Sequence, residues 1–371
     1  MAHKVSVIVP SMNVERTLDE ALSSIEGQTF QNIEILALND GSTDGTLRIM
    51  QEHAARDPRI VVVDKPNEGY GATCNRGIEM AKGDYIAIVE PDDWIEPRFF
   101  EDLLAFADTL EPPIDIIKSA YWRVFTQDPA HPMKVNCAFK GRVHPKHQPF
   151  AIAEAPELLL HHPAIWSALY RKAWLDEKGI RFRPIPGAGW ADNPFLVETL
   201  CQTARIAYLD RPYYCYREDD ANQGIAFAKK HPFLPLERWN DMMDILERLH
   251  ITDASVLSAQ CQRGITYAGT TIEAVGLDHP GVRDAVTKMY RRMDPDLVLQ
   301  NPRLAPAAKR LFCSLCGLPD PKISDASYVP ELLSQAVYRL ITCGPRYTLH
   351  SAREFLQHKD ARSADAGDSR Q

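Results

Sequence analysis

The sequence has no long apolar run and no excess of basic charge. No stretch approaches the roughly 18–20 consecutive apolar residues that a membrane-spanning helix requires, so we predict no transmembrane segment. Lys and Arg number 42 against 50 Asp and Glu, and 42 − 50 gives a net charge of −8 at pH 7. This balance argues against a partner held by bulk positive charge, and we expect no nucleic acid among the partners.

The sequence also lacks a disulfide framework. Its eight cysteines are scattered, at positions 74, 137, 201, 215, 261, 313, 316 and 343. Such spacing predicts free thiols in a reduced compartment. The first residues, MAHKVSVIVPSMN, are typical of a strand, because their apolar run is too short for a signal peptide. We therefore expect a cytoplasmic protein, and contact with the inner face of the membrane stays open.

What the sequence does have is a regular alternation of apolar strands and amphipathic helices over its first 110 residues. Strands are predicted at Val5–Val9, Ile33–Leu38, Ile60–Val63 and Tyr85–Val89, and helices at Thr17–Glu26, Thr43–Ala55, Gly71–Ala81 and Phe99–Leu110. Runs that are apolar throughout indicate strands buried on both faces. The alternation predicts an α/β fold with a mostly parallel sheet flanked by helices.

Beyond residue 110 the pattern changes. Residues 112–215 mix short strands with a helix near Asn193–Gln202, and the chain beyond about 226 is helical. The proline-rich stretch 302–321 is typical of a connecting loop, and 358–371 has no apolar anchors. We predict an α/β domain over 1–217, a helical C-terminal region over 218–357 and a disordered tail over 358–371.

Polar residues follow each of the four predicted strands, as PSMN, NDGS, PNEG and EPDD. The carboxyl ends of parallel strands share one edge of a sheet, where ligands bind. Glu90, Asp92 and Asp93 offer the hard oxygen ligands that Mg²⁺ or Mn²⁺ prefers, although Asp residues here and at position 40 are equally typical of turns and helix caps. The glycine-rich segment 67–77 leads into a helix and could cradle an anion.

Four segments resemble, in order and spacing, those of the family-2 glycosyltransferases: VSVIVPSMN, ALNDGSTDGT, PNEGYGATCNRG and IVEPDDWIEP. The resemblance covers about residues 4–217. It implies the GT-A fold, a Rossmann-like nucleotide-sugar-binding and catalytic domain, in the part that we delimit as 1–217.

The resemblance also implies roles for single residues in donor binding. The loop after the first strand and Asp40 would hold the nucleotide, with Asp40 reading the base, and the loop Asn67–Gly77 would flank the diphosphate. Glu90-Pro91-Asp92 matches the family's D-x-D motif, with Asp92 the ligand of Mg²⁺ or Mn²⁺ and Glu90 near the ribose. The implied nucleotide-sugar-binding residues are Pro10, Met12, Asn13, Glu15, Asp40, Asn67, Gly69, Asn75, Glu90, Asp92 and Asp93.

The segment GWADNPF resembles the family's "ED" segment, which supplies the catalytic base. Asp192 inherits that role, and Ala191 stands in place of the customary Glu. A carboxylate beside the sugar can take the proton of an attacking hydroxyl, although Asp192 would serve equally as a helix N-cap. Arg217, in YYCYR, is a candidate contact of the diphosphate, with a surface ion pair as the alternative.

These residues predict a metal-dependent inverting glycosyltransferase. We expect it to move a sugar from a nucleotide-diphosphate sugar, in particular a UDP-sugar, to a hydroxyl of a glycan or glycolipid in cell-envelope polysaccharide synthesis. Metal on Asp92 would stabilise the leaving diphosphate while Asp192 deprotonates the acceptor in a single displacement. Peripheral contact with a membrane and a homodimer are both compatible with the sequence.

Two other functions stay open. Ala191, Glu90 and Ala168 depart from the family's pattern, and at the position of Ala168 relatives often carry Lys. These departures fit a non-catalytic nucleotide-sugar-binding scaffold. A sugar nucleotidyltransferase would need a glycine-rich basic loop after the first strand, and SMNVER supplies no such loop.

Overall fold

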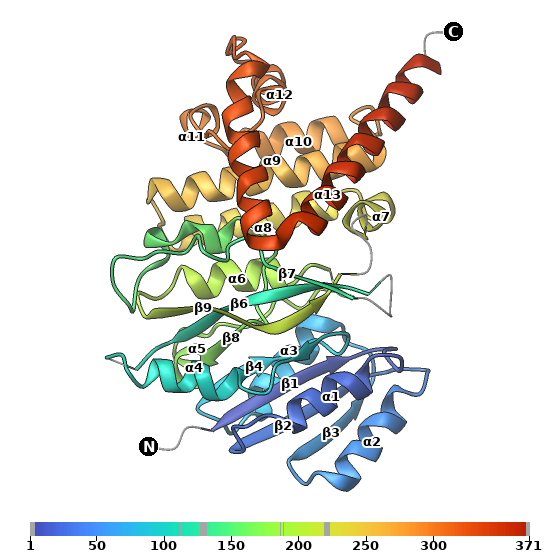
Figure 1. Ribbon diagram of the computed structural model, residues 1–371, viewed down its shortest axis with the longest axis vertical. Helices are drawn as coiled ribbons and strands as arrows, with labels where there is room; N and C mark the ends of the chain where they lie inside the picture. The colour runs from blue at the N-terminus through green and yellow to red at the C-terminus, as the bar shows by residue number, and fades with distance from the viewer. Residues whose placement is uncertain are drawn as a thin grey trace.

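A mixed β-sheet forms the centre of the molecule, and a group of helices lies beyond one half of it (Figure 1). The computed structural model describes residues 4–111, 113–126, 132–185, 187, 189–218 and 223–368, without the side chains of 223, 224 and 349–368. The order of the strands is β3-β2-β1-β4-β8-β6-β9-β5, and β7 pairs with β6.

The N-terminal half of the sheet is parallel, as predicted. Its strands are β1 (Val5–Ser11), β2 (Ile33–Asp40), β3 (Ile60–Lys65) and β4 (Tyr85–Ile88), linked by the helices α1 (Leu18–Glu26), α2 (Thr46–Arg56) and α3 (Tyr70–Met80). β1 lies between β2 and β4, with Ile8 opposite both Leu36 and Ile88. β1, β2 and β4 are buried along their whole length, which explains why their sequences are largely apolar. The register places the carboxyl ends of β1 and β2 side by side.

The other half is largely antiparallel, so the sheet as a whole is mixed. It contains β5 (Trp94–Ile95), β6 (Ile116–Phe125), β7 (Met133–Asn136), β8 (Ala168–Arg171) and β9 (Ile206–Arg217), with the helices α4 (Phe99–Ala107), α5 (Lys172–Lys178) and α6 (Asp192–Leu200). β8 runs antiparallel to both β4 and β6, whereas β9 is parallel to β6. The prediction of a mostly parallel sheet therefore describes the first four strands best.

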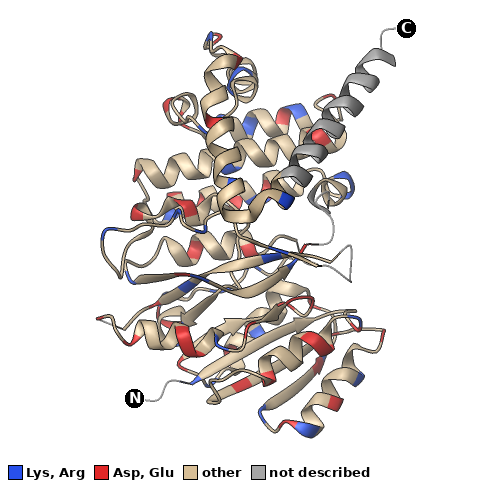
Figure 2. Cartoon of the chain, in the orientation of Figure 1, with Lys and Arg blue, Asp and Glu red and all other residues tan. Residues whose placement is uncertain are grey.

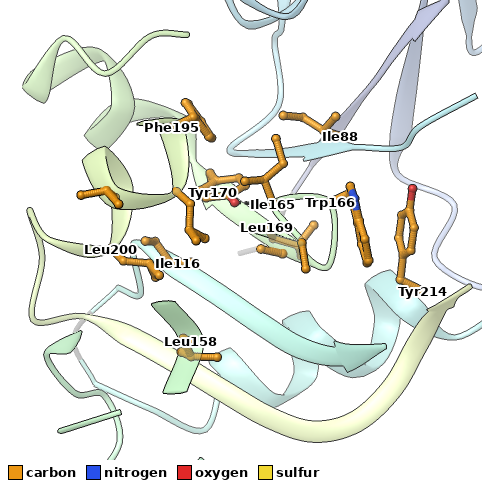
Figure 3. Packing of buried hydrophobic residues seen from close by; sticks show 14 of the residues in the cluster. Ile88, Ile116, Leu158, Ile165, Trp166, Leu169, Tyr170, Phe195, Leu200 and Tyr214 are labelled. Atoms are coloured by element: carbon orange, nitrogen blue, oxygen red, sulfur yellow. Dashed lines mark hydrogen bonds between the residues drawn. The ribbon is translucent and has the colours of Figure 1, made fainter. Parts of the chain in front are cut away.

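A buried aromatic core joins the two halves and fixes the start of α6 (Figure 3). Trp166 stacks on Tyr214 of β9 with ring centroids 4.0 Å apart. Tyr170 of β8 donates its hydroxyl proton to the carbonyl of Ile165 (2.8 Å) and meets Phe195 of α6 edge to face. Because these side chains are buried, the first turn of α6, which carries Asp192, is set by the packing of the core.

The C-terminal region is helical and packs beyond the β6–β9 half of the sheet (Figure 1). It contains α7 (Gln223–Lys230), α8 (Leu234–Arg248), α9 (Ala254–Val275), α10 (Val282–Tyr290), α11 (Pro295–Leu299), α12 (Pro306–Cys316) and α13 (Val329–Asp368), and short 3₁₀ helices lie at Ile152–Glu154, Pro156–Leu159 and Asp325–Tyr328. α9 contacts α7, α8 and the 3₁₀ helix Pro156–Leu159, which precedes β8. Basic and acidic residues are interspersed over the sheet and the helices (Figure 2).

Three local expectations differ from the structure. Residues 302–321 contain α12 rather than only a loop, because Pro306 occupies the first turn, where a missing N–H costs nothing. α2 begins at Thr46 rather than at the predicted Thr43, so Thr43 belongs to the preceding loop. The backbone of α13 is helical to Asp368, in the segment where the sequence predicts a disordered tail, and the last three residues lie outside the described part.

The predicted boundary at residue 217 coincides with the end of β9, and the division into domains stays a prediction. All eight cysteines are free, as expected from their spacing. In the part of the chain that the structure describes, no helix is both long and apolar enough to cross a membrane.

Candidate active site

A cavity of about 270 Å³ lies where the carboxyl ends of β1, β2 and β4 meet the start of α3. It is lined by Pro10, Ser11, Met12, Val14, Asp40, Gly69, Tyr70, Thr73, Glu90, Pro91, Asp92 and Gly187. Six of these come from the set that the sequence predicts: Pro10, Met12, Asp40, Gly69, Glu90 and Asp92. The fold thus brings all four strand-end segments to one place, as expected for ligand sites in such sheets.

Asp40, at the end of β2, holds the loop that begins α3. Its carboxylate accepts hydrogen bonds from the backbone N–H groups of Glu68 (2.9 Å) and Gly69 (3.0 Å), and it pairs with the ammonium of Lys65. Burial alone would raise the pKa of Asp40, but the Lys65 ammonium, the Glu68 amide and the Thr73 side chain outweigh burial and hold the pKa below its ordinary value. Asp40 is therefore ionised at neutral pH and shapes one wall of the cavity.

Gly69 allows the chain to pass closely by the segment around Gly187. Its φ of 90° and ψ of 162° lie in a region that only glycine adopts readily. A Cβ atom at this position would lie 2.9 Å from the carbonyl oxygen of Ile185 and 3.2 Å from the nitrogen of Gly187. The next residue, Tyr70, donates its N–H to the carbonyl of Gly187 (3.1 Å). This contact closes the cavity on the α3 side.

Asn13 and Glu15 stabilise the loop Gly41–Gly45 rather than line the cavity. The Asn13 side-chain oxygen accepts from the N–H of Thr43 (2.8 Å), and Asn13 has a positive φ of 53°. Glu15 accepts from the N–H of Gly45 (2.7 Å). Both residues therefore lie next to the cavity lining, and their contact with the nucleotide stays a prediction.

Asn67 and Asn75 are likewise set apart from the cavity lining. Asn67 is exposed and directs its amide at the sulfur of Met12 (2.9 Å), at the mouth of the cavity. Asn75 bonds both the N–H and the carbonyl of Phe182, each at 2.8 Å, and so ties α3 to the strand-free segment before α6. Its role in this structure is to hold that segment in place.

Glu90 is a half-buried carboxylate whose partner is a tyrosine. The Tyr70 hydroxyl donates to Glu90 Oε1 at 2.5 Å. Burial raises the pKa of Glu90 to about 8; the charges of Asp92 and Asp192 act in the same direction, and the Tyr70 hydrogen bond opposes them. Glu90 therefore holds a proton at neutral pH, and a carboxyl group with such a raised pKa is characteristic of sites that bind cations or perform acid–base chemistry.

Asp92 and Asp93 point in different directions. Asp92 is exposed at the cavity, whereas Asp93 is 2% exposed and accepts from the Tyr214 hydroxyl (2.9 Å) and the N–H of Arg217 (2.7 Å). Burial raises the pKa of Asp93 well above its ordinary value. Asp93 thus anchors β9 to the turn that presents Asp92.

The side chain of Arg217 makes contacts with the turn itself and with α1. It donates to the Asp92 carbonyl (2.9 Å) and to Glu20 of α1 (2.6 Å), and it lies over the ring of Trp94. The ion pair named as the alternative is thus present, Arg217 supports the backbone of Asp92, and its contact with the diphosphate stays a prediction.

Asp192, the first residue of α6, lies close enough to Glu90 and Tyr70 for its charge to raise the pKa of each. Burial raises the pKa of Asp192 itself to about 6, against the opposing charge of Arg263 and hydrogen bonds from Asn193. The side-chain amide of Asn193 donates to Asp192 Oδ1 (3.1 Å). A carboxylate with a pKa near neutrality is well matched to taking up a proton at physiological pH.

Four residues of the site have no role in the sequence prediction: Lys65, Tyr70, Asn193 and Arg263. Tyr70 lies within the segment PNEGYGATCNRG, so the motif could have indicated it. Lys65 ends its strand opposite Asp40 in the register, and this position could have indicated an ion pair between them. Nothing local to Arg263 links it to residue 193, 70 positions away.

Comparison with known proteins agrees with this geometry. The model of the family "Glycosyl transferase family 2" matches residues 6–178. The putative glycosyltransferase EpsH of Bacillus subtilis is 32% identical over 216 residues, which are 57% of this chain and 60% of that protein. The minor teichoic acid biosynthesis protein GgaB of B. subtilis is 41% identical over 115 residues, 30% of this chain and 13% of GgaB. The chain thus spans at most about 60% of the length of these relatives.

The fold is similar to that of S. aureus TarS (residues 1–349), with a TM-score of 0.64, 17% identity and 91% of each chain covered. TarS has been crystallised with UDP and with UDP-GlcNAc. This likeness extends through the helical region and confirms the expected GT-A fold. Residues 6–178 thus match glycosyltransferase family 2, and the fold of the chain is similar to that of TarS.

Proposed function

We propose that the protein is a metal-dependent inverting glycosyltransferase that uses a nucleotide-diphosphate sugar. The observation that carries this proposal is the cavity at the strand ends, lined by Asp40, Glu90 and Asp92, with Asp192 close by at a pKa of about 6. A UDP-sugar is the proposed donor, supported by the similarity in fold to TarS, which binds UDP and UDP-GlcNAc.

Asp92 is the proposed ligand of Mg²⁺ or Mn²⁺. Its exposed carboxylate offers hard oxygens to the cavity, and these ions commonly take only one or two protein carboxylates, completing their shell with water and phosphate oxygens. Because the described residues contain no group of three or more His, Cys, Asp or Glu that could hold a metal, the ion would depend on water and phosphate oxygens for the rest of its shell. When bound, the ion would neutralise charge on the leaving diphosphate.

The chain's own residues would perform the remaining steps. Gly69 and the strand-end loops hold the donor in the cavity. Asp192 accepts the proton of the acceptor hydroxyl as that oxygen attacks the anomeric carbon from the face opposite the diphosphate. The hydroxyl O–H bond breaks, the new glycosidic bond forms and the bond to the diphosphate breaks in one displacement, which inverts the anomeric centre.

The proposed acceptor is a hydroxyl of a glycan or glycolipid of the cell envelope. The similarity to GgaB, a teichoic acid biosynthesis protein, supports this class.

A donor panel tests the proposal. Purified protein is incubated with Mn²⁺ and UDP-, GDP- and dTDP-sugars, and release of free nucleotide is followed, with Asp192→Asn run alongside as the variant without a base. Metal-dependent UDP release from one sugar, lost in Asp192→Asn, is the expected result. UDP binding without turnover across a broad acceptor mixture would favour a nucleotide-sugar-binding scaffold, and no nucleotide binding would contradict the proposal.

A further inference from the structure

Helix α9 of the C-terminal region reaches the proposed base through a buried arginine. Arg263 is 3% exposed, and its guanidinium makes three hydrogen bonds. Nη1 donates to the carbonyl of Leu159 (2.9 Å), Nε to the Tyr267 hydroxyl (2.9 Å) and Nη2 to the side-chain oxygen of Asn193. All three sides of the guanidinium fork are thus engaged, which fixes its position.

These contacts determine which way the Asn193 amide points. The Tyr267 hydroxyl also donates to Asn193 Oδ1 (2.5 Å), so two donors converge on that oxygen. An amide oxygen that accepts from both Arg263 and Tyr267 leaves the NH₂ group on the other side. There it donates to Asp192 Oδ1 (3.1 Å), and it lies 3.4 Å from the carbonyl of Trp190.

The positive charge of Arg263 also acts on the same carboxylate, because it lowers the pKa of Asp192. Within the described residues, no Asp or Glu oxygen lies within ion-pair distance of Arg263, although a buried guanidinium is normally paired. Among the described residues, the groups in electrostatic contact with Asp192 include Tyr70 and Cys74 from α3, Glu90 after β4, Tyr216 from β9, and Tyr267 and Arg263 from α9. Arg263 is the sole cation among these six.

We propose that Arg263, together with Tyr267, is a positioning residue for the base: it orients the Asn193 amide toward Asp192 and supplies the cation that keeps this carboxylate ready to accept a proton. The helical C-terminal region is then part of the active site and not only a support for the sheet. This inference rests on the proposed function, in which Asp192 is the base.

The test compares Arg263→Met, Arg263→Lys and Tyr267→Phe with Arg238→Met. Arg238 is a matched control because it is a buried arginine of the same region whose guanidinium pairs with Asp241. The assay is steady-state UDP release from the sugar nucleotide that the donor panel identifies. Arg263→Met should lower kcat at least 10-fold and leave the donor KM within twofold, because the cavity walls are unchanged. Arg263→Lys should recover part of the loss, and Tyr267→Phe should show a smaller one.

The pH dependence separates positioning from a purely structural role. Loss of the cation should raise the pKa of Asp192, so the acid limb of the kcat profile should move to higher pH in Arg263→Met and stay in place in Arg238→Met. A kcat within twofold of wild type with an unmoved acid limb in folded Arg263→Met would overturn the proposal. Equal losses in Arg263→Met and Arg238→Met would do so as well.

A second measurement needs no turnover. In protein labelled with ¹³C at the Asp carboxyl carbons, the Asp192 signal is identified by its absence in Asp192→Asn, and its titration is followed in wild type and Arg263→Met. An upward displacement of its midpoint supports the inference, and an unchanged midpoint overturns it. The proposed function fails if Asp192→Asn keeps wild-type turnover or if no donor turns over. In either case, this titration alone decides whether Arg263 lowers the pKa of Asp192.

Discussion

The close approach at Gly69 makes Gly69→Ala a sensitive test of the cavity's construction. The backbone conformation, with φ of 90° and ψ of 162°, costs a residue with a side chain about 1–3 kcal/mol. The added Cβ would also lie 2.9 Å from the Ile185 oxygen and 3.2 Å from the Gly187 nitrogen, and both are backbone atoms. Such overpacking costs about 1–3 kcal/mol. The two effects together predict a loss of about 2–6 kcal/mol in the free energy of unfolding.

The strain can be relieved only by moving the loop that carries the cavity wall. That movement would break the bond from the Gly69 N–H to Asp40, so UDP affinity should fall together with stability. Gly141→Ala is the matched control. Gly141 has φ of 70°, and no neighbouring atom lies within 4 Å of the position that an added methyl group would take. The substitution should therefore cost only the free energy of the left-handed backbone, about 1–2 kcal/mol. Urea unfolding and calorimetric titration with UDP and Mn²⁺ measure both effects. If Gly69→Ala loses no more stability than Gly141→Ala, or binds UDP as wild type does, the reasoning is wrong.

Three other predictions concern the charged groups of the site. Asp192→Asn should stabilise the protein at pH 8. The pKa of Asp192 is about 6 in the folded protein and 3.8 ordinarily, so the folded state binds the proton more tightly than the unfolded state does. Wild type therefore has this stability at low pH and loses up to about 3 kcal/mol of it as the pH rises through 6. Thermal unfolding at pH 5 and pH 8 should show the variant's advantage growing with pH, and a constant difference would contradict this. Lys65→Met removes the partner of a buried carboxylate and should cost about 3–5 kcal/mol in urea unfolding, whereas a loss below about 1 kcal/mol would show that the two amides suffice for Asp40. EDTA or Asp92→Ala should abolish UDP release while leaving the unfolding midpoint near that of wild type, and undiminished release in EDTA would exclude the metal ligand role.

The sequence predicts the parallel half of this fold well because the relevant signals are local. Apolar runs such as Val5–Val9 alternate with amphipathic helices, and short-range periodicity fixes both the element type and the parallel connection. The antiparallel placement of β8 between β4 and β6 depends on contacts between residues more than 50 positions apart, such as Ile117 with Leu169. Periodicity carries no information about such pairing.

The candidate site shows the same division. Asp40, Glu90 and Asp92 reach the cavity because strand ends in a parallel sheet converge, which the strand-end motifs alone indicate. Asn13 and Asn75 stand in the right segments, but their side chains bond to loop backbone, and side-chain direction within a loop depends on tertiary contacts. Motif analysis could not find Arg263, because its contact with Asn193 forms only when α9 packs against the first turn of α6.

The stereochemistry of the reaction tests the central claim most directly. The anomeric proton of the transferred sugar is observed by ¹H NMR in the first minutes of donor consumption, before any free sugar can equilibrate. A single displacement with Asp192 as the base predicts that an α-linked donor gives the β-anomer first. An α-anomer as the first product would contradict the direct displacement that this structure supports.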